Sequence, residues 1–168
     1  ANYGTIIASD LMLEENTKLS IAYDGVTNGN INLSGDLDLS ATGAKVLVQG
    51  KANTSSGTID FLTANSVNGV EKIEADLGWL TSAEVNTNTY QVSYQYKPLT
   101  GYISGISSSL NNMVGTNDTL FSNLNGLSEK QGTQLIRFTE KQAADNVDIS
   151  IQTQHQLSDV IITRTSEV

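Results

Sequence analysis

The sequence contains no cysteine in its 168 residues, which excludes disulfides, thiolate metal sites and cysteine nucleophiles. Histidine occurs once, at His155, so a metal site with two histidine ligands is also excluded. A Ser-His-Asp triad through His155 would lack the Gly-x-Ser-x-Gly turn that presents the serine in many hydrolases. We therefore expect His155 to be an exposed helical residue and the chain not to be an enzyme.

Charged residues are scarce as well. They make up 16% of the chain, against about 25% in typical soluble domains. Acidic residues outnumber basic ones by 18 to 9, which gives a formal net charge of -9. Because this charge repels phosphate backbones and the basic residues form no cluster, nucleic acid is not expected as a partner.

Long apolar runs are missing too. No stretch approaches the roughly 20 apolar residues that a membrane-spanning helix needs, and no basic-then-apolar signal peptide opens the chain. The chain starts at Ala1 inside a strand-like pattern, so we expect it to be a fragment of a longer protein. Any targeting signal would lie outside this fragment.

Proline occurs only at Pro98, where the pattern of the sequence changes. Before it, short runs alternate apolar and polar residues between Gly, Asn and Ser turns, which is typical of strands. After it, apolar residues recur at spacings of three and four, which is typical of helices. The sequence therefore predicts β-solenoid coils with a C-terminal cap over residues 1–97 and a helical exit or linker segment over residues 98–168.

A turn followed by a strand recurs three times in the first part, at Gly4–Ile7, Gly29–Leu33 and Gly57–Phe61, starting 25 and then 28 residues apart. Recurrence at such a period indicates stacked coils. Apolar residues two apart would face one shared interior. These inward residues are Leu11, Leu13, Leu19, Ile21, Ile31, Leu33, Leu37, Leu39, Val46 and Val48.

Longer strands are predicted at Thr58–Leu62, Val70–Ala75 and Thr89–Tyr96. In the last, tyrosines and a valine alternate with polar residues, which predicts one buried face and one wet face. The only tryptophan, Trp79, lies between two of these strands and is expected to seal an open end of the apolar interior. The predicted core of this cap consists of Phe61, Leu77, Trp79, Tyr90, Val92 and Tyr94.

Two helical patterns follow the cap. The first comprises Ile103, Ile106, Leu110 and Val114, and the second comprises Leu120, Leu124 and Leu127. Asn117 and Ser128 are expected as N-caps, and Ser128 with Gln131 fits a capping box. Near Val147–Ile151 the alternation suits a strand, whereas the spacing of Val147, Ile151 and Ile162 suits a helix, which we favour.

Several of these passages together resemble a known family. The order Gly57–Ala64, Val67–Gly69, Leu77–Leu80 and Thr89–Tyr94 is similar to the C-terminal cap of autotransporter passengers, the classical type V secretion proteins of Gram-negative bacteria. Further on, the passages Leu110–Met113, Asn117–Phe121, Leu124–Leu127 and Gln152–Leu157 resemble the helical stretch that leads to the membrane barrel in that family.

The resemblance implies a mainly β fold: the end of a right-handed parallel β-helix with a β-strand cap, followed by a short α-helical segment. It implies a non-enzymatic, autochaperone-like folding template for surface display, located at the outer membrane and cell surface. The implied partners are the protein's own C-terminal membrane β-barrel, beyond Val168, and a host surface protein or glycan. No cofactor is expected.

Other functions need other features. An adhesin would use the Asn, Ser and Thr of exposed strands to contact a host protein or glycan. A carbohydrate-active β-helix enzyme or a phage tail part would need a carboxylate-lined groove, and Asp36 and Asp38 are the nearest candidates. Because Leu37 is expected to point inward, both carboxylates should lie outside in solvent. Asp24 before a glycine predicts a turn, since the repeated calcium-binding nonapeptide is absent.

Overall fold

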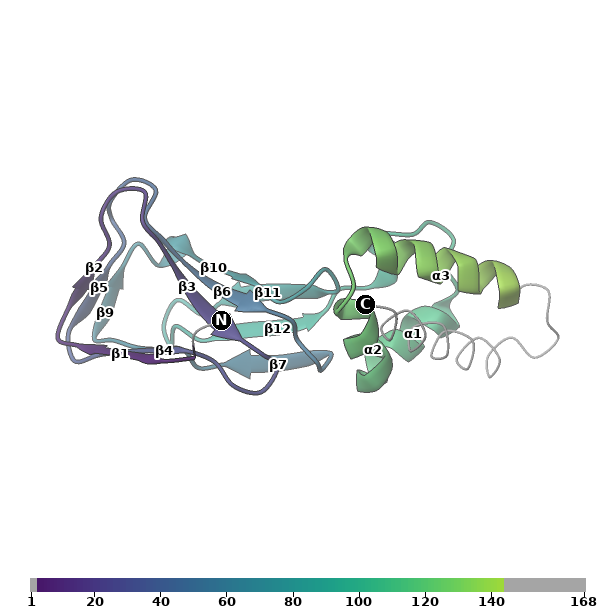
Figure 1. Ribbon diagram of the computed structural model, residues 1–168, viewed down its shortest axis with the longest axis horizontal. Coiled ribbons are helices and arrows are strands. Elements are labelled where there is room, and N and C mark those ends of the chain that lie inside the picture. The colour runs from purple at the N-terminus through teal and green to yellow at the C-terminus, as the bar shows by residue number, and fades with distance from the viewer. Residues whose placement is uncertain (1–2, 144–168) are drawn as a thin grey trace. The chain divides into compact units, whose positions relative to one another are not determined.

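The computed structural model describes residues 3–143, with side chains to residue 141 (Figure 1). The chain divides into two units. The strand unit comprises Ala1–Ala52, Ser56–Leu77 and Ser82–Gln95, and the helical unit comprises Asn53–Ser55, Gly78–Thr81 and Tyr96–Val168. The described residues form twelve strands and three α-helices, which confirms a mainly β fold with a helical part.

Three small parallel sheets dominate the strand unit, and each takes one strand from each of three successive segments. Their orders are β1-β4-β8, β2-β5-β9 and β10-β6-β3. The first segment holds β1 (Thr5–Ala8), β2 (Leu11–Met12) and β3 (Lys18–Tyr23). The second holds β4 (Asn30–Leu33), β5 (Asp36–Asp38) and β6 (Lys45–Gly50), and the third holds β8 (Leu62–Thr63), β9 (Ser66–Asn68) and β10 (Ile73–Asp76).

The pairing register confirms one predicted repeat and corrects the other. Thr5 pairs with Asn30, 25 residues later, as the recurring glycine turns predict. The third segment starts later than predicted, because Ile31 pairs with Leu62. Gly57 instead lies in β7 (Ser56–Ile59), which pairs antiparallel with β12 (Val92–Tyr96). Alternation alone cannot distinguish these two kinds of partner, since both place every second residue on the same face.

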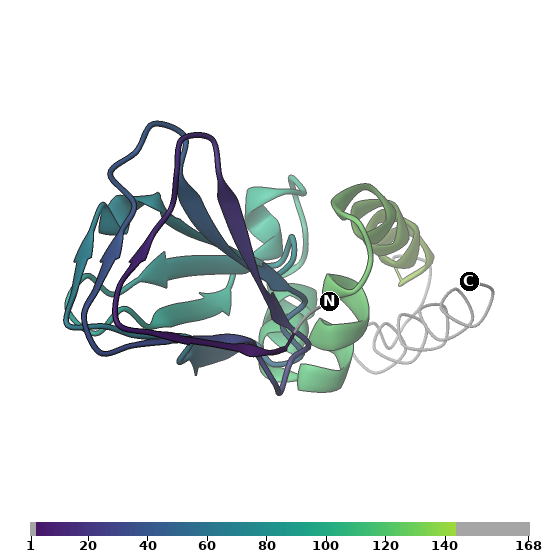
Figure 2. The same ribbon diagram turned by 60° about the vertical axis from the view of Figure 1, so that its left-hand side comes forward.

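The interior of the strand unit contains the alternating apolar residues that the sequence predicts. Leu37 and Val46 are 0% exposed, in the middle strands of their sheets. Figure 2 shows the three sheets surrounding a shared interior. Burying side chains of this size stabilises the fold by about 1.5 to 3 kcal/mol each. The remaining buried predicted residues are Leu13, Ile21, Ile31, Leu33, Leu39 and Val48.

Two predicted strands are shorter than expected. The predicted strand at Val70–Ala75 begins as a 3₁₀ turn over Val70–Lys72, and only then becomes β10. Gly69 precedes this turn with φ 87°, a left-handed conformation that glycine adopts without strain. The predicted strand at Thr58–Leu62 divides between β7 and β8. In both places the strand ends although the apolar pattern of the sequence continues.

The helical unit contains a 3₁₀ turn at Leu99–Gly101 and the helices α1 (Ser108–Thr116), α2 (Asp118–Asn125) and α3 (Glu129–Ala143). The predicted apolar positions Leu110, Val114, Leu120 and Leu124 are buried. The first helix is shorter than its pattern suggests. Ile103 and Ile106 precede it, because Ser107 is the N-cap and accepts a hydrogen bond from the Leu110 N–H at 3.1 Å.

Both predicted helix starts are confirmed. The side chain of Asn117 accepts a hydrogen bond from the Leu120 N–H at 3.1 Å. The Gln131 N–H donates to Ser128 Oγ at 3.1 Å, and the Ser128 N–H donates back to Gln131 Oε1 at 3.2 Å. This is the reciprocal capping box that the sequence predicts. The ambiguous pattern at Val147–Ile151 lies outside the described residues.

Candidate functional site: the hairpin end and the first edge of the strand unit

A hairpin of β11 (Thr81–Val85) and β12 forms one end of the strand unit, with the order β11-β12-β7. Its turn depends on Asn86, whose side chain accepts hydrogen bonds from the N–H groups of Asn88 and Thr89 at 2.8 and 3.0 Å. Tyr90 takes a left-handed φ of 61° in this turn. The predicted strand therefore starts at Val92, and Tyr90 is not part of it.

The hairpin lies beside β7 in one antiparallel sheet, through β12. Val92 pairs with Ile59 and Tyr94 pairs with Gly57. Val92 is 0% exposed and Tyr94 is 6% exposed. The tyrosine needs the glycine, because a Cβ atom on Gly57 would lie 2.6 Å from Tyr94 Oη. Gly57 therefore leaves the room that the Tyr94 side chain occupies beside β7.

Two buried tyrosines share a polar contact in this interior. The hydroxyls of Tyr23 and Tyr94 lie 3.5 Å apart, and the Tyr23 hydroxyl donates to the Gly25 carbonyl at 3.0 Å. Burial, and then the neighbouring Tyr94, raise the pKa of Tyr23 above its usual value. Both hydroxyls thus have polar neighbours in an otherwise apolar interior.

The predicted cap core is found in two places. Phe61, Leu77, Val92 and Tyr94 are buried in the strand unit, at 1%, 1%, 0% and 6% exposure. Tyr90 is only half-buried and lies in the hairpin turn. Trp79 is also half-buried, and it belongs to the helical unit.

The contacts of Trp79 described here are with other residues of the helical unit. Its Nε1 donates a hydrogen bond to the Leu124 carbonyl at 2.8 Å. Its ring meets Tyr102 edge-on, with 5.1 Å between centroids. Gly132 of α3 faces the ring so closely that a Cβ atom there would lie 2.2 Å from Trp79 Cζ2. A glycine inside a helical pattern indicates close packing, so the position of Gly132 is the feature of the sequence that could have predicted this contact.

Two further polar residues connect segments of the helical unit. The sequence pattern did not predict either contact. Asn125 is fully buried, and its side-chain oxygen accepts from the Leu80 N–H at 3.1 Å. Glu140 of α3 accepts from the N–H and the hydroxyl of Ser107, at 3.2 and 3.0 Å. Each polar side chain therefore connects the backbone of a segment distant in sequence.

The opposite end of the strand unit is a set of terminal strands, β1, β2 and β3, which we call the first edge. Its inward residues are less covered than their partners in the next segment. Leu11 is half-buried, while its partner Leu37 is 0% exposed, and Leu19 is half-buried, while its partner Val46 is 0% exposed. The first edge thus combines strand edges with partly uncovered apolar side chains.

Asp36, one of the candidate catalytic carboxylates, belongs to a ladder of turn hydrogen bonds. Asp10 Oδ1 accepts from the Asp36 N–H at 2.7 Å, and Asp36 Oδ1 accepts from the Ser66 hydroxyl at 2.8 Å. Asp10 fits because position 35 is glycine: a Cβ atom on Gly35 would lie 2.1 Å from Asp10 Oδ1. These bonds give Asp36 a structural role in the turns.

The other candidate aspartates also bind turn backbone. Asp38 accepts from the Ser40 N–H at 2.9 Å, and hydrogen bonds from the Ser40 side chain and backbone lower the pKa of Asp38. Asp24 accepts from the N–H groups of Thr27 and Val26 at 2.6 and 2.8 Å, and these bonds lower its pKa. The turn predicted at Asp24 is therefore confirmed.

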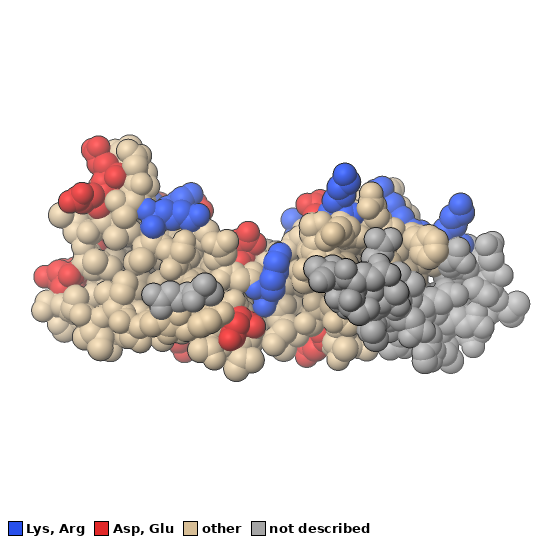
Figure 3. Space-filling view, viewed as in Figure 1, with Lys and Arg blue, Asp and Glu red and all other residues tan. Residues whose placement is uncertain are grey.

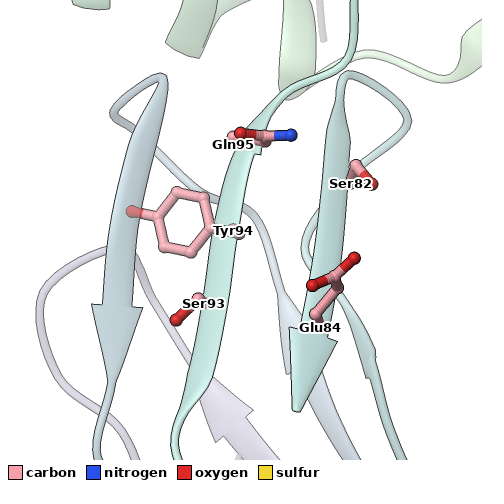
Figure 4. Close-up of a pocket in the computed structure, with 5 residues that line it drawn as sticks. All are labelled: Ser82, Glu84, Ser93, Tyr94 and Gln95. Atoms are coloured by element: carbon pink, nitrogen blue, oxygen red, sulfur yellow. The ribbon is translucent and has the colours of Figure 1, made fainter. Parts of the chain in front are cut away.

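Figure 4 shows a pocket of about 140 Å³ on the hairpin, lined by Ser82 and Glu84 of β11 and by Ser93, Tyr94 and Gln95 of β12. Glu84 is the one carboxylate in this lining, so the pocket has no paired acid and base. Among residues 3–143, no group of three His, Cys, Asp or Glu side chains could hold a metal ion. The candidate His155 lies outside the described residues.

Comparison with known proteins gives no match: no protein-family model, no curated protein and no solved structure is significantly similar to this chain. Within the described part of the chain, no helix is both long and apolar enough to span a bilayer. On the face shown in Figure 3, basic side chains appear as separate small groups.

Proposed function

We propose that the strand unit is the end of a right-handed parallel β-helix and that the chain is a non-enzymatic, autochaperone-like folding template for surface display of an autotransporter passenger. One observation carries this proposal: the two ends of the parallel sheets differ. After the last segment, the chain continues from β10 into the antiparallel hairpin, which lies beside β10, whereas no described strand pairs with the outer side of the first edge. Right-handed connections between parallel strands are the general rule.

The physical argument concerns the first edge. A further strand segment that pairs with β1, β2 and β3 would form new backbone hydrogen bonds and would cover Leu11 and Leu19. Repeat proteins grow in this way, by adding one segment to an existing neighbour. Because the chain continues from β10 into the antiparallel hairpin, the proposal places further parallel segments at the first edge.

The remaining elements of the proposal concern partners and location. The helical unit would serve as the linker to the protein's own membrane β-barrel, and the strand unit would be displayed at the outer membrane of a Gram-negative bacterium. An adhesive surface is less supported. Among the described side chains, the exposed aromatics are Tyr3 and Phe138, which lie in different units and form no common patch within either unit.

A display assay tests the template role. The chain is placed between tagged β-helical coils and an autotransporter barrel behind a signal peptide, and the tag is measured on cells by flow cytometry with and without protease. Val92→Asp buries an unpaired charge in the hairpin, which costs several kcal/mol. Because domains are stable by about 5 to 15 kcal/mol, most protease-resistant surface tag should disappear.

Ser93→Asp is the matched control, because Ser93 is exposed on the same strand. This variant should display the tag like the parent chain. Heat-modifiability of the barrel on gels confirms equal barrel insertion in all samples. Full display of a protease-resistant tag by the Val92→Asp variant would refute the template role.

A further inference from the structure

A groove of about 430 Å³ lies between β10 and β11 of the strand unit. Both strands are the last in their sheets: β10 bonds to β6 on one side, and β11 bonds to β12 on one side. They follow each other along the chain, yet they are not hydrogen-bonded to each other. Their facing sides are therefore two strand edges with a space between them, and terminal strand edges are templates for another strand.

The walls of this groove are apolar at every second residue. Ile73 and Ala75 of β10 face Ala83 and Val85 of β11 across it. This period of two is the period of an extended chain, whose successive side chains point to opposite faces. A strand placed between the walls would thus set its own alternate apolar side chains against these four residues.

Small side chains create the space. Ala75 pairs in register with Val48 of β6, and Val48 is 0% exposed. Ala75, Ala83 and Val85 are only half-buried. Apolar side chains at interior-facing positions are normally covered, so the half-buried state of these three residues leaves apolar area for an occupant to bury.

The rim of the groove is acidic. Glu71 and Glu74 are exposed and line it, and no basic residue belongs to its lining. Glu74 forms an ion pair with Lys45 at 3.6 Å, and both side chains are more than 40% exposed, so the pair contributes little. Glu71 has no ion pair within the described part of the chain. The charge of the rim therefore favours a cationic occupant.

We propose that this groove binds an extended peptide segment of a partner protein by β-strand addition, and that the segment carries apolar residues at alternate positions flanked by lysine or arginine. Open strand edges supply backbone hydrogen bonds, the apolar walls select the alternation, and the acidic rim selects the charge. The groove is lined by three of the four residues of β10, residues 73–75, about 10 Å of strand. This inference does not depend on the proposed role in display.

The test uses the full chain labelled with nitrogen-15 and the acetylated, amidated heptapeptide Lys-Val-Thr-Val-Thr-Val-Lys. Two-dimensional NMR spectra are recorded while the peptide is added. The amide signals of Ile73–Asp76 and Ser82–Val85 should shift until the site is saturated. The same peptide with N-methyl groups on its three valines cannot donate those backbone bonds and should not bind. A second peptide with glutamate in place of both lysines should bind about tenfold more weakly.

Variants locate the site. Glu71→Lys combined with Glu74→Lys should weaken binding of the lysine peptide about tenfold, because two attractions become repulsions. Glu84→Lys makes the same charge change on the other face of β11 and should leave the affinity within about twofold. Ala83→Leu fills the groove, so it should abolish binding while the melting temperature stays at or above that of the parent chain.

Several results would overturn the proposal. One such result is the absence of any signal shift at 1 mM peptide, because the Kd would then lie well above 1 mM. Equal binding of the N-methylated peptide would exclude strand addition. Signal shifts confined to the first edge would place the peptide elsewhere, and self-association of the free chain through β10 and β11 would identify a second copy as the occupant.

Discussion

The strand unit and the helical unit are held together by different kinds of hydrogen bond. In the strand unit, backbone bonds connect successive segments at equivalent positions, such as Asn16 N–H to the Thr42 carbonyl at 2.8 Å. In the helical unit, single side chains connect distant backbone groups, as Trp79 does with the Leu124 carbonyl. The strand unit therefore distributes its stability over many similar contacts, whereas the helical unit concentrates it in a few residues.

This difference has a consequence for substitutions. In the strand unit, the cost of a change should depend on how well its sheet neighbours cover the residue. In the helical unit, it should depend on whether a backbone partner is lost. Because the chain has two units, unfolding need not be a single transition, and each unit should be followed by its own probe.

The largest expected effect is in the middle of a parallel sheet. Leu37→Ala removes a side chain that is 0% exposed, and should lower the free energy of unfolding by about 3 to 5 kcal/mol. Leu11→Ala at the paired position of the first edge should cost about half as much, because Leu11 is only half-buried. Urea unfolding followed by circular dichroism in the β region measures both. Equal decreases in the free energy of unfolding for the two variants would contradict the difference in burial between Leu37 and Leu11.

Trp79→Ala should have the next largest effect. It removes a half-buried ring and the hydrogen bond to the Leu124 carbonyl, and should cost about 3 kcal/mol in the helical unit. Limited proteolysis should then cleave α2 and α3 at lower protease concentration, while the strand unit stays resistant. Trp79→Phe keeps most of the ring and should lose only about 1 kcal/mol. Faster cleavage within β3 or β6 would place the role of Trp79 in the strand unit instead.

Removing the cap of α3 should have a smaller effect. Ser128→Ala loses the bond to the Gln131 N–H and should cost about 1 kcal/mol. Ser128→Asp keeps a side-chain acceptor and should be close to the parent chain. Amide hydrogen exchange in the first turn of α3 should increase for the alanine variant alone. Similar exchange in both variants would argue against the capping role.

The smallest expected effect concerns acid. Two backbone bonds lower the pKa of Asp24 below 3.8, so its native turn is favoured when the carboxylate is charged. This contribution is fully present above pH 3.8 and is lost as the pH falls through the lowered pKa. A carbon-13 titration of the carboxyl group should therefore give a midpoint under 3.8. A midpoint above 3.8 would mean that the turn does not bind the charged form.

The sequence predicts local features of this fold well. Alternation identified Leu37 and Val46 as inward residues, because the two faces of a strand follow directly from a period of two. The capping box at Ser128 was predictable because all its partners lie within three residues. Such features depend on neighbours in the chain and need no knowledge of tertiary contacts.

Long-range partners could not be predicted in this way. Gly57 continues the turn pattern of Gly4 and Gly29, but its strand pairs with β12, more than 30 residues away. Trp79 has the size expected for sealing an interior, but only the position of Gly132 decides where its ring packs. The groove between β10 and β11 could not be predicted either, since the residues of its walls have ordinary strand patterns. Tertiary packing selects among partners that the local pattern leaves equivalent.

The ladder from Asp10 through Asp36 to Ser66 has a consequence for how such a chain can change in length. The turns at Asp10 and Asp36 each offer a carboxylate oxygen to the following turn, so residues 10–35 form a repeating module with matching ends. Duplicating this module in a gene would add one more set of three strands and leave no turn without its counterpart. In the described part of the helical unit no comparable module recurs, because the bonds from Asn125 to Leu80 and from Glu140 to Ser107 join unlike segments. Gene duplication and recombination can therefore lengthen the strand unit in whole modules, while the helical unit must be inherited intact.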